Sequence, residues 1–371
     1  MKIKIIIFIS SLMLFSCSTK QDLLVKETPR NPLVSSDYYS LAMEKAKLFE
    51  DSSYSDLNSY KMAEDNFIKA ISSDQGDADI WFNLGRLYLY GNEYVKAKEA
   101  FKNAIKFRKG FIEAYSLLAK TYLEDGDKNG ALNVLLKANE TIPNNDVIMN
   151  NTALMYLLLG DLDQAKRVSE IIIKKNPKFV PAYNTLGNVY YLNGKYEYAR
   201  FIYIKALDEG LENGSIYSNL GVVTIKLEGR SQAYDLLKKG VELSPNDPYT
   251  HLNLGEYLLS SGDNEGSINE FKRALSLNPR LVEAIVNLAS AYSNLGMFLE
   301  ARELYEKALQ YAPSYPETCF NYGVFLIDNL KKPQEALDMF KRYVTLKNGE
   351  INSSHRVFGY IKDITAQKRD K

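Results

Sequence analysis

The chain has 371 residues, of which 46% are hydrophobic, so it is long enough to bury a large core. Its 46 basic residues equal its 46 acidic residues, and because it has no basic excess we expect no nucleic-acid partner. Its only two cysteines, Cys17 and Cys319, lie far apart in the sequence, which excludes a disulfide framework and a zinc site.

The first residues have the composition of a secretory signal. A basic start that contains Lys2 and Lys4 is followed by an apolar run from Ile5 to Phe15. A run of this length is too short to cross a bilayer as a helix. We therefore expect residues 1–16 to be a signal peptide.

The end of this segment resembles a bacterial lipobox, in which a small residue precedes a cysteine that is acylated before cleavage. Leu14, Ser16 and Cys17 match the lipobox pattern, whereas Phe15 is bulkier than the pattern prefers. The resemblance implies a lipoprotein that is acylated at Cys17, with palmitate among the acyl chains, and several buried chains hold a protein stably on a membrane. The alternative is an ordinary signal peptide with an incidental cysteine.

Residues 17–37 are polar and contain Pro29 and Pro32, which is typical of a flexible tether between a membrane and a folded domain. The residue after the cysteine is Ser18 and not an aspartate, which resembles the outer-membrane sorting pattern of bacterial lipoproteins. The expected location is therefore the cell envelope, with the chain anchored in the outer membrane and facing the periplasm.

From residue 78 onward, equivalent residues recur at a constant spacing along the sequence, for example Trp81, Tyr115 and Met149. One residue of each unit, usually aromatic or apolar and named here the opener, is followed four positions later by a small residue. The openers are Trp81, Tyr115, Met149, Tyr183, Tyr217, His251, Ile285 and Cys319. The small residues are Gly85, Ala119, Ala153, Gly187, Gly221, Gly255, Ala289 and Gly323, and proline ends most units, at Pro143, Pro177, Pro245, Pro279 and Pro313.

Each unit contains two apolar periodic stretches of helical length, separated by a turn that usually contains glycine. We expect the small residues to let the two helices approach, and large residues such as Tyr88 and Phe101 to fill the space to the neighbouring hairpin. Proline ends the second helix because it has no N–H and clashes with the preceding turn. A single hairpin cannot bury its apolar face, so the hairpins must stack.

This pattern resembles the tetratricopeptide repeat, which places Trp or Tyr, Leu-Gly, Tyr, Ala, Phe, Ala and Pro at the same period, about 34 residues. The resemblance implies an all-α fold: a right-handed superhelical solenoid of about nine helix-turn-helix repeats.

Departures from the regular spacing mark the first and last repeats of the predicted solenoid. The solenoid is expected over residues 38–349, with an irregular first repeat over 38–77 that holds a long internal loop of polar residues. Regular repeats follow over 78–315 and a last repeat, with one extra residue, over 316–349. Residues 350–371 are expected to form a capping helix and tail, because a solenoid needs a cover for its exposed end.

Residues suited to catalysis are scarce. His251 and Cys319 occupy opener positions, where a packed histidine and an inert buried thiol are expected, and His355 is expected to be a solvated residue of the last segment. No phosphate-binding loop, nucleophile motif or metal-ligand cluster occurs. We therefore expect no enzyme activity, no cofactor, no metal and no small-molecule substrate.

An asparagine recurs two residues after most openers. In proteins with such repeats this position faces the concave groove, where a carboxamide hydrogen-bonds the backbone of an extended peptide. The alternative is that asparagine is simply common at this position of the repeat. The predicted groove residues are Asn83, Asn151, Asn219, Asn253, Asn287 and Asn321, together with Phe82, Arg86, Lys120, Asn184, Asn188 and Tyr191.

The expected function is that of a membrane-anchored scaffold or adaptor of the bacterial cell envelope, which binds a protein partner or an extended peptide in its groove. The alternative is a peptide-capturing or pilotin-like chaperone for assembly of a pilus, secretion or motility machine. A third class, a glycosyltransferase that uses the repeats for substrate docking, is disfavoured because only a short segment follows the last repeat. The clamp of lysine, asparagine and arginine residues that binds chaperone C-termini does not occur in register.

Overall fold

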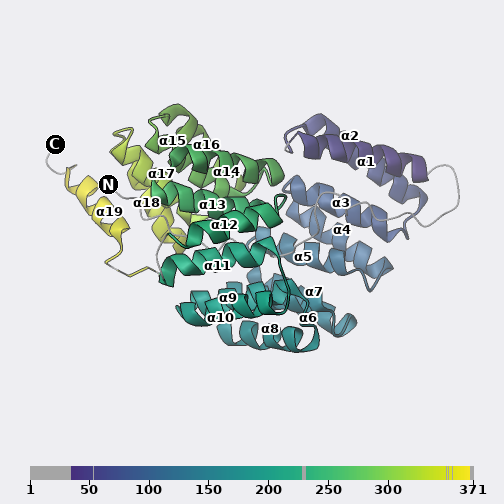
Figure 1. The fold of residues 1–371 in the computed structure, drawn as a ribbon. Coiled ribbons are helices and arrows are strands. Elements are labelled where there is room, and N and C mark those ends of the chain that lie inside the picture. The colour runs from purple at the N-terminus through teal and green to yellow at the C-terminus, as the bar shows by residue number, and fades with distance from the viewer. Residues whose placement is uncertain are drawn as a thin grey trace. The chain divides into compact units, whose positions relative to one another are not determined.

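The computed structural model describes residues 35–367, apart from 53, 228–230, 348, 350 and 353. These residues form nineteen α-helices and no strand, which confirms the predicted all-α fold (Figure 1). The predicted signal peptide, most of the predicted tether and Cys17 lie outside the described residues.

The helices fall into two compact units, which are described separately. The N-terminal unit ends at Leu211 and the C-terminal unit begins at Glu212. In the N-terminal unit the helices are α1 (Ser35–Asp51), α2 (Leu57–Ser73), α3 (Ala78–Tyr90), α4 (Tyr94–Phe107), α5 (Ile112–Glu124), α6 (Lys128–Thr141), α7 (Asp146–Leu158), α8 (Leu162–Lys175), α9 (Val180–Leu192) and α10 (Tyr196–Asp208). In the C-terminal unit they are α11 (Gly214–Leu227), α12 (Ala233–Leu243), α13 (Pro248–Ser261), α14 (Asn264–Leu277), α15 (Val282–Asn294), α16 (Phe298–Tyr311), α17 (Pro316–Asp328), α18 (Pro333–Lys347) and α19 (Arg356–Gln367).

The helix boundaries follow the period of the sequence. From α3 to α17, every first helix of a hairpin begins one full period after the first helix before it. Gly126 and its equivalents in four other turns have positive φ, which glycine adopts at no steric cost. The second helices that precede a repeat-ending proline stop two residues before it, as α8 does before Pro177.

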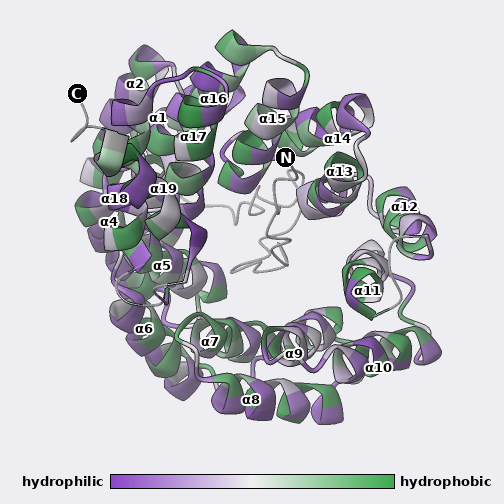
Figure 2. Cartoon of the chain, turned by 90° about the vertical axis from the view of Figure 1, so that its left-hand side faces the viewer, coloured by the Kyte–Doolittle hydropathy of each residue, from purple (hydrophilic) through white to green (hydrophobic). Residues whose placement is uncertain are grey.

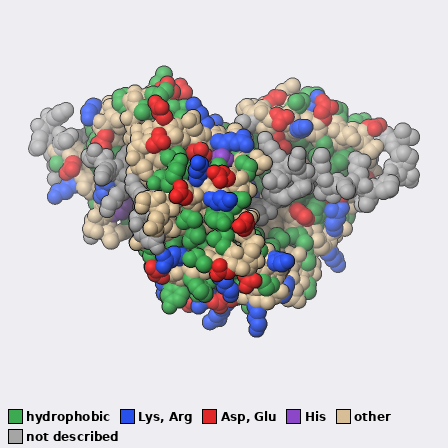
Figure 3. Space-filling model, viewed as in Figure 1, with side chains coloured by type: hydrophobic (Ala, Val, Ile, Leu, Met, Phe, Trp, Pro, Cys, Tyr) green, Lys and Arg blue, Asp and Glu red, His purple; other side chains and the backbone are tan. Residues whose placement is uncertain are grey.

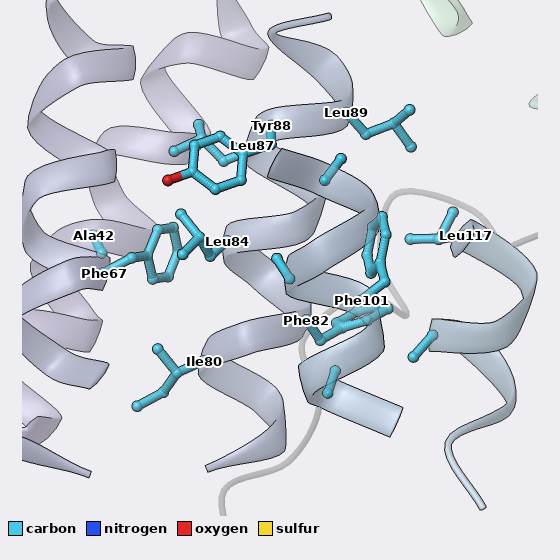
Figure 4. Close-up of a cluster of buried hydrophobic side chains, with 14 of the residues drawn as sticks. Ala42, Phe67, Ile80, Phe82, Leu84, Leu87, Tyr88, Leu89, Phe101 and Leu117 are labelled. Carbon is cyan, nitrogen blue, oxygen red and sulfur yellow. The ribbon is translucent and has the colours of Figure 1, made fainter. Parts of the chain in front are cut away.

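The small residue after each opener allows close packing inside the hairpin. A Cβ atom added to Gly85 would lie 2.7 Å from the ring of Phe101, and one added to Gly187 would lie 2.3 Å from the ring of Tyr203. Phe101 therefore packs against Gly85 of its own hairpin. It also packs towards the next hairpin, as predicted, and Figure 4 shows it near Leu117.

Stacking of the hairpins builds the core. In Figure 4, Leu84 of α3 lies beside Phe67 and Ala42 of the preceding hairpin. These side chains are all at most 3% exposed and belong to one cluster that runs from α1 to α5. Each hairpin thus completes the core of its neighbour, and Figure 2 shows apolar and polar residues alternating around the helices.

First helices and second helices differ in what they contact. Within the N-terminal unit the first helices α1, α3, α5, α7 and α9 contact one another in sequence, and within the C-terminal unit α11, α13, α15 and α17 do the same. Among the described residues, the second helices show no comparable row of contacts. Because the first helices pack closer together, each unit curves with its first helices on the inner side.

The first repeat differs from the expected long loop. Its helices α1 and α2 have 17 residues each, against 13 or 14 in most later hairpins, and only residues 52–56 separate them. Phe49, which is buried against Tyr54 and Tyr60, extends α1, and the side chain of Asp56 accepts hydrogen bonds from the first amides of α2. The extra residues therefore lengthen the helices.

The helix α19 packs against α18, with Val357 and Ile364 buried. His355 differs from the prediction of a solvated side chain: it packs against Phe320 and Tyr343, and its Nδ1 accepts a hydrogen bond of 3.3 Å from the amide of Val357. This histidine caps α19, because an acceptor is needed at the exposed amides of a helix start.

Candidate interaction surface

The recurrent asparagines lie on the first helices, which form the inner side of each unit. Asn83, Asn151, Asn219, Asn253 and Asn287 are buried, and Asn321 is partly exposed. Five of the six recurrent asparagines are therefore buried on the inner side, because all of them stand two residues after an opener.

Several of these carboxamides bind the hairpin that precedes them. The Nδ2 atom of Asn151 donates to Ser116 at 3.0 Å, and that of Asn253 donates to Ser218 at 2.9 Å. In the same way, Asn83 donates to the hydroxyl of Tyr39 at 2.8 Å, and Asn287 donates to Oε1 of Glu256 at 2.8 Å. The asparagine row joins consecutive hairpins through hydrogen bonds, and direct contact with a peptide remains a prediction.

Thr185 interrupts the asparagine row and yet makes the equivalent bond. Its hydroxyl donates to Oδ1 of Asn150 on the preceding hairpin at 2.9 Å. The acceptors Ser116, Asn150 and Ser218 each stand one residue after an opener. These partners were not predicted from the sequence, although a polar residue directly after the opener could have indicated them.

Most of the other predicted groove residues are also buried. Phe82 is 2% exposed and packs against Phe101 and Phe111, and Arg86 pairs with Glu50 at 2.8 Å. These two side chains therefore belong to the core and to an ion pair between α3 and α1.

The remaining predicted residues lie on α5 and α9. Asn188 accepts a hydrogen bond of 3.0 Å from the hydroxyl of Tyr203, Tyr191 packs edge-on against Tyr196, and Asn184 is buried. Lys120 is partly exposed and lies over the ring of Tyr90. Lys120 and Asn321 are thus the two predicted groove residues whose side chains a partner reaches without rearrangement.

Glu256 gives the inner side of the C-terminal unit an unusual group. Its side chain is 2% exposed; Oε1 accepts from Asn287, and Oε2 has no hydrogen-bond partner. Burial, followed by the charge of Glu283, raises the pKa of Glu256 to about 8, which favours the neutral carboxyl over the carboxylate.

The residues considered for catalysis are satisfied or inert. Nδ1 of His251 lies 2.6 Å from Glu270 and Nε2 lies 3.0 Å from the carbonyl of Pro245, as expected of a packed histidine. Cys319 is fully buried, and burial raises the pKa of its thiol, which disfavours the nucleophilic thiolate. Among the described residues, no group of three histidine, cysteine or acidic side chains is placed to hold a metal ion.

The surface charges are mixed. Acidic and basic side chains are interspersed with apolar ones over the face that Figure 3 shows. Within the part of the chain that the structure describes, no helix has the length and apolar character required to span a membrane.

Family models for the tetratricopeptide repeat match residues 78–110, 112–145, 180–209, 248–281 and 282–315. These matches coincide with hairpins that have the predicted spacing. The five matched segments are tetratricopeptide repeats. The hairpins α7–α8 and α11–α12 keep the same period between the matched repeats. Tetratricopeptide repeats generally act as scaffolds for protein–protein interaction and are typically non-catalytic.

Several curated proteins with similar sequences are longer than this chain. The BBSome complex member BBS4 of Bos taurus is 26% identical over 285 residues, which cover 77% of this chain and 54% of that protein. The chain spans about half the length of the curated relatives it matches.

Solved structures agree on the fold. The human IFIT1 dimer with m7Gppp-AAAA aligns with a TM-score of 0.58 at 16% identity, covering 90% of this chain and 83% of that one. A tetratricopeptide repeat protein from Parabacteroides merdae aligns with a TM-score of 0.51 at 18% identity, covering 69% of this chain and 99% of that one. At these identities the likeness concerns the fold.

Proposed function

We propose that this chain is a membrane-anchored scaffold or adaptor of the bacterial cell envelope, which binds a protein partner along its first helices. The observation that carries the proposal is the unbroken row of first helices in each unit, joined by hydrogen bonds between hairpins. A row of this kind presents a rigid surface, and rigid surfaces bind with a small loss of conformational entropy.

Two further observations support binding of a protein. BBS4 of Bos taurus, a sequence relative, is named as a BBSome complex member. Lys120 and Asn321, which are partly exposed on first helices, offer a charged and an amide side chain, and such polar groups suit the rim of a protein interface.

The anchor part of the proposal depends on the sequence of the first residues. The basic start, the short apolar run and Cys17 have the order of a lipoprotein signal. Acylation at Cys17 would place the repeats at the outer membrane, on its periplasmic side, with the residues between Cys17 and the start of α1 at Ser35 as the tether.

The partner can be tested by photocrosslinking in cells. A photoreactive amino acid at Lys120 or Asn321 should capture one protein partner, because both side chains are partly exposed on first helices. The matched control is Glu99, which is exposed on the second helix α4. Capture at Glu99 alone, or at none of the three positions, would contradict binding along the first helices.

A peptide titration separates the scaffold from a peptide-capturing or pilotin-like chaperone. Titration with unrelated extended peptides should give no saturable binding to a scaffold. Saturable binding that disappears in Asn219→Ala and Asn253→Ala would favour the chaperone.

The anchor has its own test. Cells given labelled palmitate should label the wild-type chain and not the Cys17→Ser variant. Equal labelling of the variant would rule out acylation at this cysteine, without bearing on the interaction surface.

A further inference from the structure

The outward face of α10 is unusually apolar. Tyr198, Phe201 and Ile204 are 60%, 61% and 41% exposed, whereas Ala199, Ile202 and Tyr203 of the same helix are buried. The exposed residues recur every three positions, so they form one stripe along a single side of the helix. Glu197 and Lys205, also exposed, flank this stripe, which we name the α10 stripe.

The other repeats provide a comparison, because equivalent positions recur one period apart. At the position of Phe201 they carry only polar or charged residues: Glu99, Asn133, Arg167, Asp235, Asn269 and Glu303. At the position of Ile204 they carry Lys102, Leu136, Glu170, Lys238, Lys272 and Glu306. The apolar stripe is therefore a departure of α10 and not a requirement of the repeat.

An exposed group of large apolar side chains with a polar border marks an interaction site. The order of residues in the α10 stripe indicates what covers it. If two copies of α10 lie antiparallel about a two-fold axis at Phe201, residues equally spaced on either side of Phe201 face each other. Tyr198 then faces Ile204 of the second copy, and Glu197 faces Lys205.

We propose that the α10 stripe is the interface of a homodimer in which two copies of α10 pack antiparallel. The two Phe201 rings meet at the axis, where they are removed from water. Opposite charges, Glu197 of one copy and Lys205 of the other, face each other at both ends of the interface. Such a self-complementary surface is what a two-fold dimer requires. Because one helix from each copy buries less than the ~1,200 Å² of a typical stable interface, the dimer should be weak and depend on concentration.

Glu197 is already paired within its own helix, with Arg200 at 2.8 Å. This pair does not prevent the proposed contact, since a carboxylate has two oxygens and accepts several hydrogen bonds. It does make the charge contribution small, so the apolar residues should carry most of the dimer stability.

The first experiment is analytical ultracentrifugation of the full chain with Cys17→Ser, over a hundredfold range of concentration. The parent should shift from monomer to dimer, and Phe201→Arg should raise the dissociation constant at least tenfold. Arginine is the residue that α8 carries at the equivalent position, Arg167, so the helix should tolerate it. Glu303→Arg, at the equivalent position of α16, is the matched control and should leave the dissociation constant unchanged.

The second experiment tests the orientation. Glu197→Lys and Lys205→Glu should each weaken the dimer, because each puts like charges together at both ends. The double variant restores opposite charges in an antiparallel pair and should recover the dimer. Failure of the double variant to recover would overturn the antiparallel arrangement.

The experiments also distinguish the dimer from other partners that could cover the α10 stripe. A chain that stays monomeric at every concentration overturns the proposal, and so does a dimer that is insensitive to Phe201→Arg. Binding of the monomer to phosphatidylethanolamine and phosphatidylglycerol vesicles, lost in Phe201→Arg, would assign the stripe to a lipid surface instead. Circular dichroism of each variant should show unchanged helix content and unfolding temperature.

Discussion

At the scale of single residues, the buried carboxyl of Glu256 should make stability depend on pH. Its ordinary pKa of 4.5 applies in the unfolded chain, and burial raises the pKa in the folded chain to about 8. Between these values the folded chain holds a proton that the unfolded chain has lost. The free energy of unfolding therefore falls as pH rises through this window and is flat above it.

The variant Glu256→Gln tests this expectation, because glutamine keeps an acceptor for Asn287 and cannot ionise. Urea unfolding of both proteins at several pH values should show the variant gaining stability over the wild type as pH rises. The gain should be on the order of 1–4 kcal/mol by pH 8.5, since one pKa unit corresponds to ~1.4 kcal/mol. A difference that does not change with pH would contradict the protonated carboxyl.

The sequence predicted where these residues lie along the repeat but not which atoms they bind. Asn151 and Asn253 were assigned to the groove from their offset after the opener, and both lie on the inner first helices. Their bonds to Ser116 and Ser218 depend on how hairpins stack, and a period in one dimension does not contain that geometry. The same limit applies to the unpartnered oxygen of Glu256, which burial creates.

At the scale of helices, packing inside a hairpin should depend on paired residue sizes. Gly85→Ala places a Cβ atom 2.7 Å from the ring of Phe101, and overpacking of this kind costs about 1–3 kcal/mol. The next hairpin carries Ala119 and Leu135 at the same positions. The double variant Gly85→Ala, Phe101→Leu copies that pair and should be more stable than the sum of the single effects predicts.

The control for this cycle is Gly359→Ala in α19. No atom lies within 4 Å of a Cβ added there, so only the gain in helix propensity, at most ~1 kcal/mol, should remain. Chemical unfolding of the wild type, the two single variants and the double variant gives the coupling energy. Additive effects of Gly85→Ala and Phe101→Leu would contradict the paired packing.

Docking of α19 should weaken in acid. Burial, followed by the charges of Arg356 and Lys347, lowers the pKa of His355 below its ordinary value of 6.5. A histidine with a lowered pKa favours the folded state above pH 6.5, and this contribution is lost as pH falls. Protonation also removes the Nδ1 acceptor that caps the amide of Val357.

Hydrogen exchange of residues 356–367, corrected for intrinsic rates, measures this docking. Protection in the wild type should fall severalfold between pH 7.5 and pH 5.5, whereas His355→Asn, which can still cap the helix, should respond less. Equal responses of the two proteins would show that His355 does not control the docking.

Helix positions were the part of the fold that the sequence predicted best. The strict period of the repeats, with glycine in the turns and proline after the second helices, determines the starts of α3 to α17. The first repeat was less predictable, because its polar segment was interpreted as a loop. Buried aromatic contacts of Phe49 with Tyr54 and Tyr60 override that local polarity, and such contacts involve residues that the sequence does not bring together by spacing.

At the scale of the whole molecule, the two units share one design: first helices inside and second helices outside. In the scaffold proposal, a partner binds along the inner helices, and the α10 stripe on the outward side joins two copies. The two surfaces use different residues, so Phe201→Arg should weaken the dimer and leave crosslinking from Lys120 unchanged. Loss of both in this variant would mean that partner binding requires the dimer.

The balance of 46 basic and 46 acidic residues predicts no affinity for nucleic acid. Fluorescence anisotropy with a short capped or uncapped RNA should show no saturable binding at physiological salt. Saturable binding that weakens with salt would place this chain in a different functional class.

The central claim is that the first helices form the working surface, and hydrogen exchange of the purified chain, alone and with the crosslinked partner, tests it most directly. The scaffold account predicts slower exchange upon binding in first helices, including α5 and α17, and little change in the second helices α6 and α16. Protection confined to second helices, or none at all, would contradict the account.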